Sequence, residues 1–166
     1  MIHNYFFISH VPTRSMDSPF VPDDFIIPKV FENERFRLRM LSVNDVEKDY
    51  EAVMESRVLL HKMFGGPWPI EGFTLEENLA DLERHQKEFL NRDAFAYTVV
   101  SLDESKVLGC IYINPPKEGT GNVPYVNIWV RQTEYDKGLD EILFQTVKNW
   151  IKTEWPFEKI LFPGRE

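Results

Sequence analysis

The stretch of sequence that decides the fold runs Asn127-Ile-Trp-Val-Arg-Gln-Thr-Glu-Tyr-Asp-Lys-Gly-Leu-Asp-Glu-Ile-Leu143. Its beginning, residues 126–130, is rich in β-branched and aromatic side chains and is typical of a β-strand. A short polar turn follows, and an amphipathic helix begins near Gly138. Many folds hold phosphate where a strand leads through a short turn into a helix, because the first backbone N–H groups of a helix lack intrahelical partners. The stretch therefore predicts a strand–turn–helix unit able to bind an anionic group.

The composition is that of one globular domain. The chain has 166 residues, of which 43% are hydrophobic and 28% charged, so it can bury a sizeable core. The net charge of −8 argues against a nucleic-acid-binding protein and against docking on an anionic membrane, since both need a basic surface. The same charge is compatible with a cationic substrate such as an amine. No apolar run is long enough to span a bilayer and we identify no signal peptide, so we expect a cytoplasmic protein.

Hydrophobic periodicity predicts a mixed order of strands and helices after residue 34. Phe36–Leu41 alternates apolar and basic side chains, which indicates a half-buried strand. Thr74 and Glu77 have the spacing of a capping box at the start of a helix. The expected strands are residues 36–41, 94–101, 107–113, 123–131 and 159–162, and the expected helices are residues 42–61, 74–92 and 137–153. This order predicts an α/β (α+β) fold with a mixed, mostly antiparallel sheet of about five strands, helices on both faces and a parallel final strand.

Residues 1–33 differ from the rest and are expected to form an extended N-terminal arm. Proline favours extended, non-helical chain, and this segment carries Pro12, Pro19, Pro22 and Pro28. The apolar residues 25–27 are unlike a solvated tail, so the arm is expected to lie on the domain or on a second subunit. The sequence thus predicts a single domain over residues 34–166, with a homodimer through the arm as one possible assembly.

The order of elements over residues 34–162 resembles the GNAT acetyltransferase superfamily. The resemblance is carried by residues 36–45 at the first strand and helix, by Lys106–Ile113 with its glycine-containing hydrophobic run, and by Ile128–Leu139 at the strand–turn–helix unit. It implies that acetyl-CoA lies in a gap between the central strand and a splayed neighbour. It also implies that the pyrophosphate sits on backbone N–H groups of the turn, and that the acetyl group is transferred to an amine by direct attack on the thioester.

The turn departs from the pattern of the family it resembles. The family has Arg or Gln, two residues, Gly, one residue, and then Gly or Ala, whereas these positions hold Tyr135, Gly138 and Asp140. The Asp140 carboxylate places a like charge near a pyrophosphate. The chain also ends at Glu166, soon after the fifth family strand, so we expect a degenerate, C-terminally short member. The resemblance assigns cofactor binding to residues on both sides of the turn: Trp129, Val130, Arg131, Lys137, Gly138, Leu139 and Asp140.

The sequence does not identify a catalytic base. Tyr112, Tyr125 and Asn127 lie on strands where family members place substrate-contacting groups, and they are the catalytic candidates; each also fits a core or surface role. Arg131 is either a phosphate contact or a surface charge at a strand end. The single cysteine, Cys110, and four histidines without metal-binding spacing predict no metal site.

Two functions of different classes fit these observations. The first is an acyl-CoA-dependent N-acetyltransferase, a transferase that uses acetyl-CoA and acts on a small amine. The alternative is a catalytically inactive GNAT-like module that binds a small ligand or a protein partner through the splayed strands. The sequence leaves the acceptor, the acyl group, CoA binding itself and the oligomeric state open.

Overall fold

Five antiparallel strands form one sheet in the described part of the chain. The computed structural model describes residues 19–165. The strands lie side by side in sequence order: β1 (Val30–Glu32), β2 (Arg37–Met40), β3 (Phe95–Val100), β4 (Val107–Asn114) and β5 (Tyr125–Val130). Each strand pairs antiparallel with the next. This confirms the predicted sheet of a mixed α/β fold.

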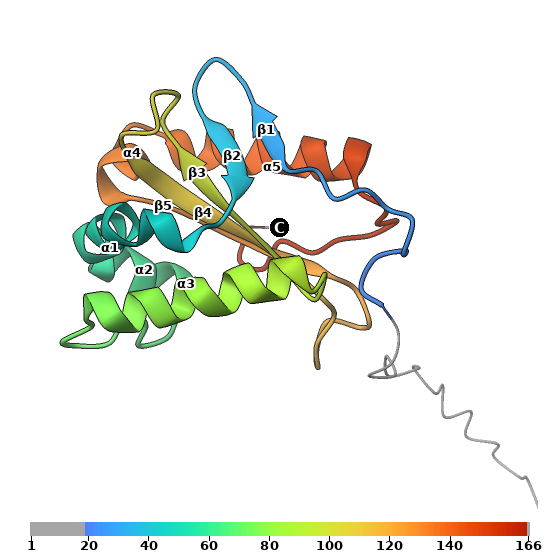
Figure 1. Ribbon diagram of the computed structural model, residues 1–166, viewed down its shortest axis with the longest axis horizontal. Helices are drawn as coiled ribbons and strands as arrows, with labels where there is room; N and C mark the ends of the chain where they lie inside the picture. The colour runs from blue at the N-terminus through green and yellow to red at the C-terminus, as the bar shows by residue number, and fades with distance from the viewer. Residues whose placement is uncertain (1–18, 166) are drawn as a thin grey trace, which may run out of the picture.

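Helices cover both faces of the sheet (Figure 1). On one face lie α1 (Val46–Glu55), α2 (Arg57–Phe64) and α3 (Leu75–Leu90); on the other lies α5 (Leu139–Glu154), which follows the short helix α4 (Gln132–Asp136). The alternation of side chains along the strands builds two apolar layers. Tyr97 and Ile111 pack in the same core cluster as Trp150 of α5, whereas Cys110 and Trp129 belong to the cluster beneath α1. The predicted helices on both faces are confirmed.

The predicted helix over residues 42–61 is interrupted at Ser56. A 3-10 turn (Val43–Asp45) leads into α1, and α2 begins only after Ser56. The buried Ser56 Oγ donates to the Ala52 carbonyl at 2.7 Å and accepts from the Gln132 N–H at 2.9 Å. A serine side chain that bonds its own backbone competes with a continuous helix. The predicted capping box is confirmed at the start of α3, where Thr74 and Glu77 cap each other's N–H groups at 3.1 and 2.8 Å.

The polar turn after β5 is more ordered than its sequence predicts. Residues 132–136 form α4, and α5 begins at Leu139 rather than at the predicted Lys137. Gly138 lies between them with φ +85°, a left-handed conformation that favours glycine. This glycine therefore lets the chain change direction between two helices.

The fifth strand of the sheet is β1, which was not predicted because the proline-rich sequence before it favours an extended arm. The predicted final strand over residues 159–162 is reduced to one parallel bridge between Tyr125 and Leu161. Residues 22–25 are fastened to the end of α3, because Arg92 Nη2 donates to the Pro22 and Phe25 carbonyls at 2.8 and 3.0 Å. The described part of the expected arm thus lies on the same domain. Residues 1–18 lie outside the described residues, and the division at residue 33 stays a prediction.

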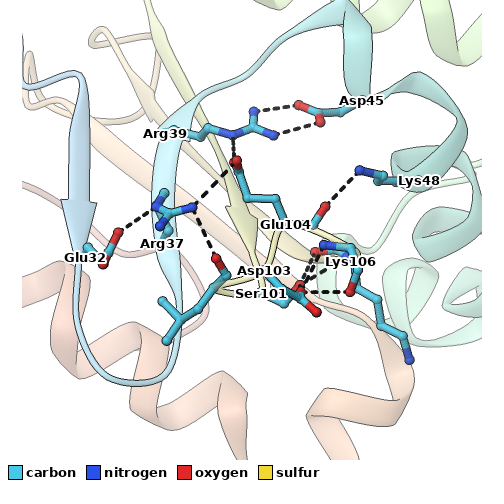
Figure 2. A network of polar contacts seen from close by, with 11 residues as sticks. Glu32, Arg37, Arg39, Asp45, Lys48, Ser101, Asp103, Glu104 and Lys106 are labelled. Atoms are coloured by element: carbon cyan, nitrogen blue, oxygen red, sulfur yellow. Dashed lines mark hydrogen bonds and ion pairs between the residues drawn. The ribbon is translucent and has the colours of Figure 1, made fainter.

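A network of ion pairs joins β2 to the β3–β4 turn and the start of α1 (Figure 2). The Arg39 guanidinium donates to both oxygens of the buried Asp45 carboxylate at 2.7 and 2.8 Å, and its Nε contacts Glu104. Lys48 Nζ reaches the Glu104 carbonyl at 2.8 Å. The Asp45 hydrogen bonds raise the pKa of Arg39, against the opposing effect of burial. The network fixes α1 against β2 and the β3–β4 turn, and so fixes one wall of the site described below.

Gly109 marks the closest approach of β4 to β5. A Cβ atom at this position would lie 2.1 Å from the Trp129 carbonyl oxygen and 2.9 Å from Val130 Cα. Both contacts are with backbone, which cannot move aside as a flexible side chain can. The β4–β5 pairing that positions the end of β5 therefore requires glycine here.

We expect Gly109→Ala to destabilise the fold by about 3 kcal/mol or more, because the new methyl group forces two paired strands apart. Urea unfolding of the full chain measures this loss. Gly66→Ala is the matched control: Gly66 is exposed, has no atom within 4 Å of an added Cβ and needs no left-handed φ. Equal midpoints for the two variants would show that the strands do not depend on this close approach.

Candidate functional site

The N-terminus of α5 is open to a ligand. Gly138 is its N-cap residue, and within the part of the chain that the structure describes no side chain caps this helix. The first backbone N–H groups of α5 therefore lack the partner that a capping side chain supplies elsewhere, for example at Thr74. Such N–H groups and the positive end of the helix dipole favour an anion. The predicted position of the anion-binding turn thus has the backbone chemistry that it needs.

The side chain of Arg131 is committed to α1. The residue is buried, and its guanidinium donates to Glu55 at 2.7 Å, to Glu51 at 2.8 Å and to the Val107 carbonyl at 3.2 Å. Its hydrogen bond holds the pKa of Glu51 below its usual range. The expected surface charge is therefore wrong, because the side chain points inward. The expected phosphate contact stays a prediction, and it requires the guanidinium to leave these carboxylates.

Asp140 is neutralised by a residue that sequence reasoning missed. Arg165 Nη1 and Nη2 lie 2.8 and 2.9 Å from the two oxygens of the Asp140 carboxylate, and Nη2 also donates to the Ile128 carbonyl at 3.0 Å. The pair is largely buried, with side-chain exposures of 13% and 18%. A compensated carboxylate repels phosphate far less than an isolated one. No local signal in the sequence reveals this pairing, since the partners lie 25 positions apart.

A first cavity of about 480 Å³ lies beside β5 and the first turn of α5. Its lining includes Tyr125 and Asn127 of β5, Asp140 of α5 and the cationic side chains of Lys117 and Arg165. Of the cofactor candidates of the sequence, Asp140 alone is in this lining. Trp129, Val130 and Leu139 are buried in the cores, and Lys137 is exposed and pairs with Glu134 at 3.2 Å. The buried candidates can therefore reach a ligand only through their backbone groups.

A second cavity of about 280 Å³ lies between α1, α3 and the strands. It shares Phe64, Tyr125 and Asn127 with the first cavity, so the two meet at β5. Tyr112 also lines the second cavity, and the structure thus brings the three catalytic candidates of the sequence to one place. Burial raises the pKa of Tyr112 well above its usual value, so its phenol is protonated at neutral pH. Its oxygen accepts a hydrogen bond from Trp129 Nε1 at 3.2 Å.

Two titratable residues of the second cavity were missed at the sequence level. Asp49 is buried, and desolvation raises its pKa to about 6, although a hydrogen bond from Asn78 at 2.9 Å opposes the shift. Burial and the charge of Arg84 lower the pKa of His85. The sequence places both residues on predicted helices. There the hydrophobic pattern alone gives no sign of a functional site. Only the packing of α1 against α3 brings them together.

In residues 19–165 no group of three His, Cys, Asp or Glu side chains is arranged to hold a metal ion. No helix in the same range is long and apolar enough to cross a membrane.

Comparisons with known proteins identify relatives by structure alone. No family model and no curated protein matches the sequence. RimL, a ribosomal L7/L12 α-N-protein acetyltransferase solved with coenzyme A, matches with a TM-score of 0.65 and 13% identity, over 80% of this chain and 73% of that one. The microcin C7 self-immunity acetyltransferase MccE, solved with acetyl-CoA and AMP, matches with a TM-score of 0.60 and 16% identity, over 76% of this chain and 66% of that one. A ribosomal-protein-S5-alanine acetyltransferase from Vibrio fischeri matches with a TM-score of 0.55 and 17% identity, over 79% of this chain and 71% of that one. These likenesses show the fold that the chain shares with acetyltransferases.

The raised pKa of Asp49 makes stability depend on pH. In the unfolded chain an aspartate titrates near 3.9, whereas in the folded chain Asp49 titrates at about 6, so the folded state binds more protons between these values. Stability from this group is therefore present below about pH 4 and is lost as the pH rises through about 6. We expect Asp49→Asn to stabilise the protein at pH 7 by on the order of 2 kcal/mol and to change it little near pH 4.

Urea unfolding of both proteins at the two pH values checks this. The exposed Glu47→Gln on the same helix serves as the control and should show no such pH dependence. A difference between wild type and Asp49→Asn that stays constant with pH would contradict the raised pKa.

Proposed function

We propose that this chain, which has the fold of the GNAT acetyltransferases, transfers the acetyl group of acetyl-CoA to a small primary amine. The observation that carries the proposal is the meeting of two cavities at Tyr125 and Asn127 of β5. One cavity leads to the uncapped N-terminus of α5, and the other leads to the buried carboxylate of Asp49. The structural neighbours support it, since MccE was solved with acetyl-CoA and RimL with CoA.

The first cavity has the groups that suit the phosphates of CoA. The N–H groups that begin α5 suit one anionic group, and Lys117, which also lines the cavity, adds a cation. Arg165 compensates Asp140, which removes the main electrostatic obstacle in the sequence. Lys137 and the backbone of Gly138 and Leu139 complete the proposed phosphate contacts.

The outer edge of β5 suits the amide groups in the arm of CoA. β5 is the last strand of the sheet, and on its outer side backbone pairing with the following chain is described only at residues 124–126. Beyond this point the Ile128 carbonyl accepts a hydrogen bond from Arg165, and the other outward-facing backbone groups can pair with backbone-like amides, which can add to a sheet as a further strand does. The proposed contact of Val130 is of this kind, through the main chain. The Trp129 carbonyl faces β4 beside Gly109, so a main-chain contact of Trp129 is not expected at this edge.

The proposed reaction joins an amine nitrogen to the acetyl carbon, breaks the carbon–sulfur bond and releases CoA as the thiol. One proton of the nitrogen passes to the departing thiolate as the amide forms, and the ammonium form of the amine must lose another proton before attack. His85 is suited to accept it, because its lowered pKa leaves the imidazole neutral at pH 7. Its Nδ1 lies 3.2 Å from Glu88 Oε2, which favours a proton on Nδ1 and leaves Nε2 as the acceptor, 3.4 Å from Arg84 Nη2. Asn127 and Tyr125, at the junction, are proposed to orient the two substrates.

One observation favours the alternative, a GNAT-like module without catalysis. Arg165 already bonds the Ile128 carbonyl and Asp140 at the edge where CoA is proposed to lie. In this alternative the first cavity binds a smaller ligand or a partner and no acetyl group is transferred. For the enzyme, the use of acetyl-CoA leads us to expect action in the cytoplasm. A homodimer through residues 1–33 stays a prediction.

Calorimetric titration of the full chain with acetyl-CoA separates the two functions. Gly138→Glu should weaken binding by at least about tenfold, because it places a carboxylate at the phosphate position. Gly72→Glu is the matched control: Gly72 also has a positive φ, of +74°, lies in the α2–α3 loop and has open space around its Cβ position. It should cost similar stability and leave affinity unchanged.

Failure of the wild-type protein to bind acetyl-CoA at millimolar concentration would remove the acetyltransferase proposal. Equal affinities for Gly138→Glu and the wild type would show that the phosphates do not bind at the start of α5. Where acetyl-CoA binds, release of free thiol in the presence of amines measures turnover.

A further inference from the structure

Asp49 is a buried carboxylate that lacks a cationic partner in residues 19–165. Its exposed fraction is 4%, and its recorded hydrogen bond comes from the neutral amide of Asn78 at 2.9 Å. In the described residues no Lys, Arg or His nitrogen lies within 4.0 Å of it, although the equally buried Asp45 four positions earlier is paired with Arg39. Burying a carboxylate without a cation costs stability. The second cavity, which Asp49 lines, is where a cation from outside can reach it.

The walls of the second cavity suit a cation attached to a flat apolar group. The rings of His85 and Tyr112 lie with centroids 4.9 Å apart, and Trp68 forms another part of the lining. Aromatic faces attract cations and also stack on flat apolar groups. The cavity therefore combines one buried negative charge with aromatic surface.

Neighbouring charges strengthen the preference for a cation. Asp45 and Asp81 both add to the negative potential at Asp49. Arg84, the arginine in the lining, is half-exposed and contacts Asp81 at 3.4 Å and Glu88 at 3.3 Å. Its charge is thus balanced by carboxylates of its own helix, and the cavity keeps the negative charge of Asp49.

On the basis of the proposed acetyl transfer, we propose that the second cavity holds the acceptor as a compact aromatic primary ammonium and that Asp49 recognises its charge. At about 280 Å³ the cavity lies at the small end of ligand sites, which typically begin at about 300 Å³. It accommodates a small arylalkylamine or the first residue of a peptide. Both carry the same ammonium group, and the experiment below distinguishes them.

The test is calorimetric titration of the full chain with 2-phenylethylamine, with and without CoA present. Wild-type protein should bind the amine, and Asp49→Asn should lose affinity by at least about tenfold, which is about 1.4 kcal/mol. Glu47→Gln, an exposed charge change on the same helix, should bind as the wild type does. Circular dichroism and urea unfolding confirm that each variant is folded, and Asp49→Asn is expected to be the more stable at pH 7.

Two further titrations test whether the ligand must be charged and whether its ammonium group belongs to a small amine or to a peptide. The neutral analogue 2-phenylethanol should bind at least about tenfold more weakly than the amine. A tripeptide with an N-terminal phenylalanine and a free amino group tests the peptide source: binding that depends on Asp49 would assign peptide amino termini, and its absence would assign small amines. Equal binding of amine and alcohol, or full affinity in Asp49→Asn, would overturn the proposal.

The pH dependence of amine binding distinguishes recognition of the ligand by Asp49 from a purely structural role of this residue. Affinity of the wild type should fall between about pH 7.5 and about pH 5 as Asp49 takes up its proton, whereas that of Asp49→Asn should change little. The titratable groups that face Asp49 are Asp45, Asp81, Cys110 and Tyr112, and the charged or titratable side chains of Arg84 and His85 line the same cavity.

The outcomes separate this inference from the proposed function. If acetyl-CoA does not bind but the amine binds in an Asp49-dependent manner, the acetyl transfer fails and the cation site stands. If acetyl-CoA binds and no amine does, the cation site fails alone.

Discussion

The site depends on the ion pairs between Arg131 and the carboxylates of α1. Arg131 directly follows β5, and through Glu51, Glu55 and the Val107 carbonyl it binds the end of that strand to α1 and to β4 at once. Beside it the Gln132 N–H bonds Ser56 Oγ, at the break between α1 and α2. A buried arginine is costly unless such partners are present, so the turn after β5 has one favourable position. That position fixes α4 and Gly138, and with them the open N-terminus of α5.

The carboxylates of the α1 region divide into paired and unpaired ones, and the division separates structure from function. Asp45 and Glu55 are matched with Arg39 and Arg131. Asp49, between them in the sequence, is left with a neutral partner although it is as deeply buried as Asp45. Perturbed carboxyl groups cluster at functional sites, and the proposed ammonium ligand would supply the cation that Asp49 lacks. Asp140 is instead paired with Arg165, which reduces its repulsion of a phosphate at the proposed anion-binding turn.

Patterns of local origin were predicted from the sequence, and pairings between distant residues were not. The strands β2–β5 and the box of Thr74 and Glu77 depend on neighbours in the chain, and the structure confirms them. The break at Ser56 was missed because it depends on a hydrogen bond to residue 132. β1 was missed because the prolines before it favour a loop.

The candidate site follows the same division. The position of the turn and the convergence of Tyr112, Tyr125 and Asn127 were accessible from element order, since adjacent strands bring them to one place. The burial of Arg131, the compensation of Asp140 and the lone charge of Asp49 each depend on side chains from other elements. No periodicity or spacing encodes such contacts.

We infer that the ion pairs of Arg131 position the turn and that its guanidinium does not itself bind phosphate. The affinity for acetyl-CoA of the double variant Glu51→Gln/Glu55→Gln tests this most directly, with folding verified by circular dichroism. The account predicts that binding weakens by about tenfold, because the turn loses its anchor while Arg131 gains freedom. Tighter binding than that of the wild type would contradict it, since Arg131 would then act on the phosphates itself.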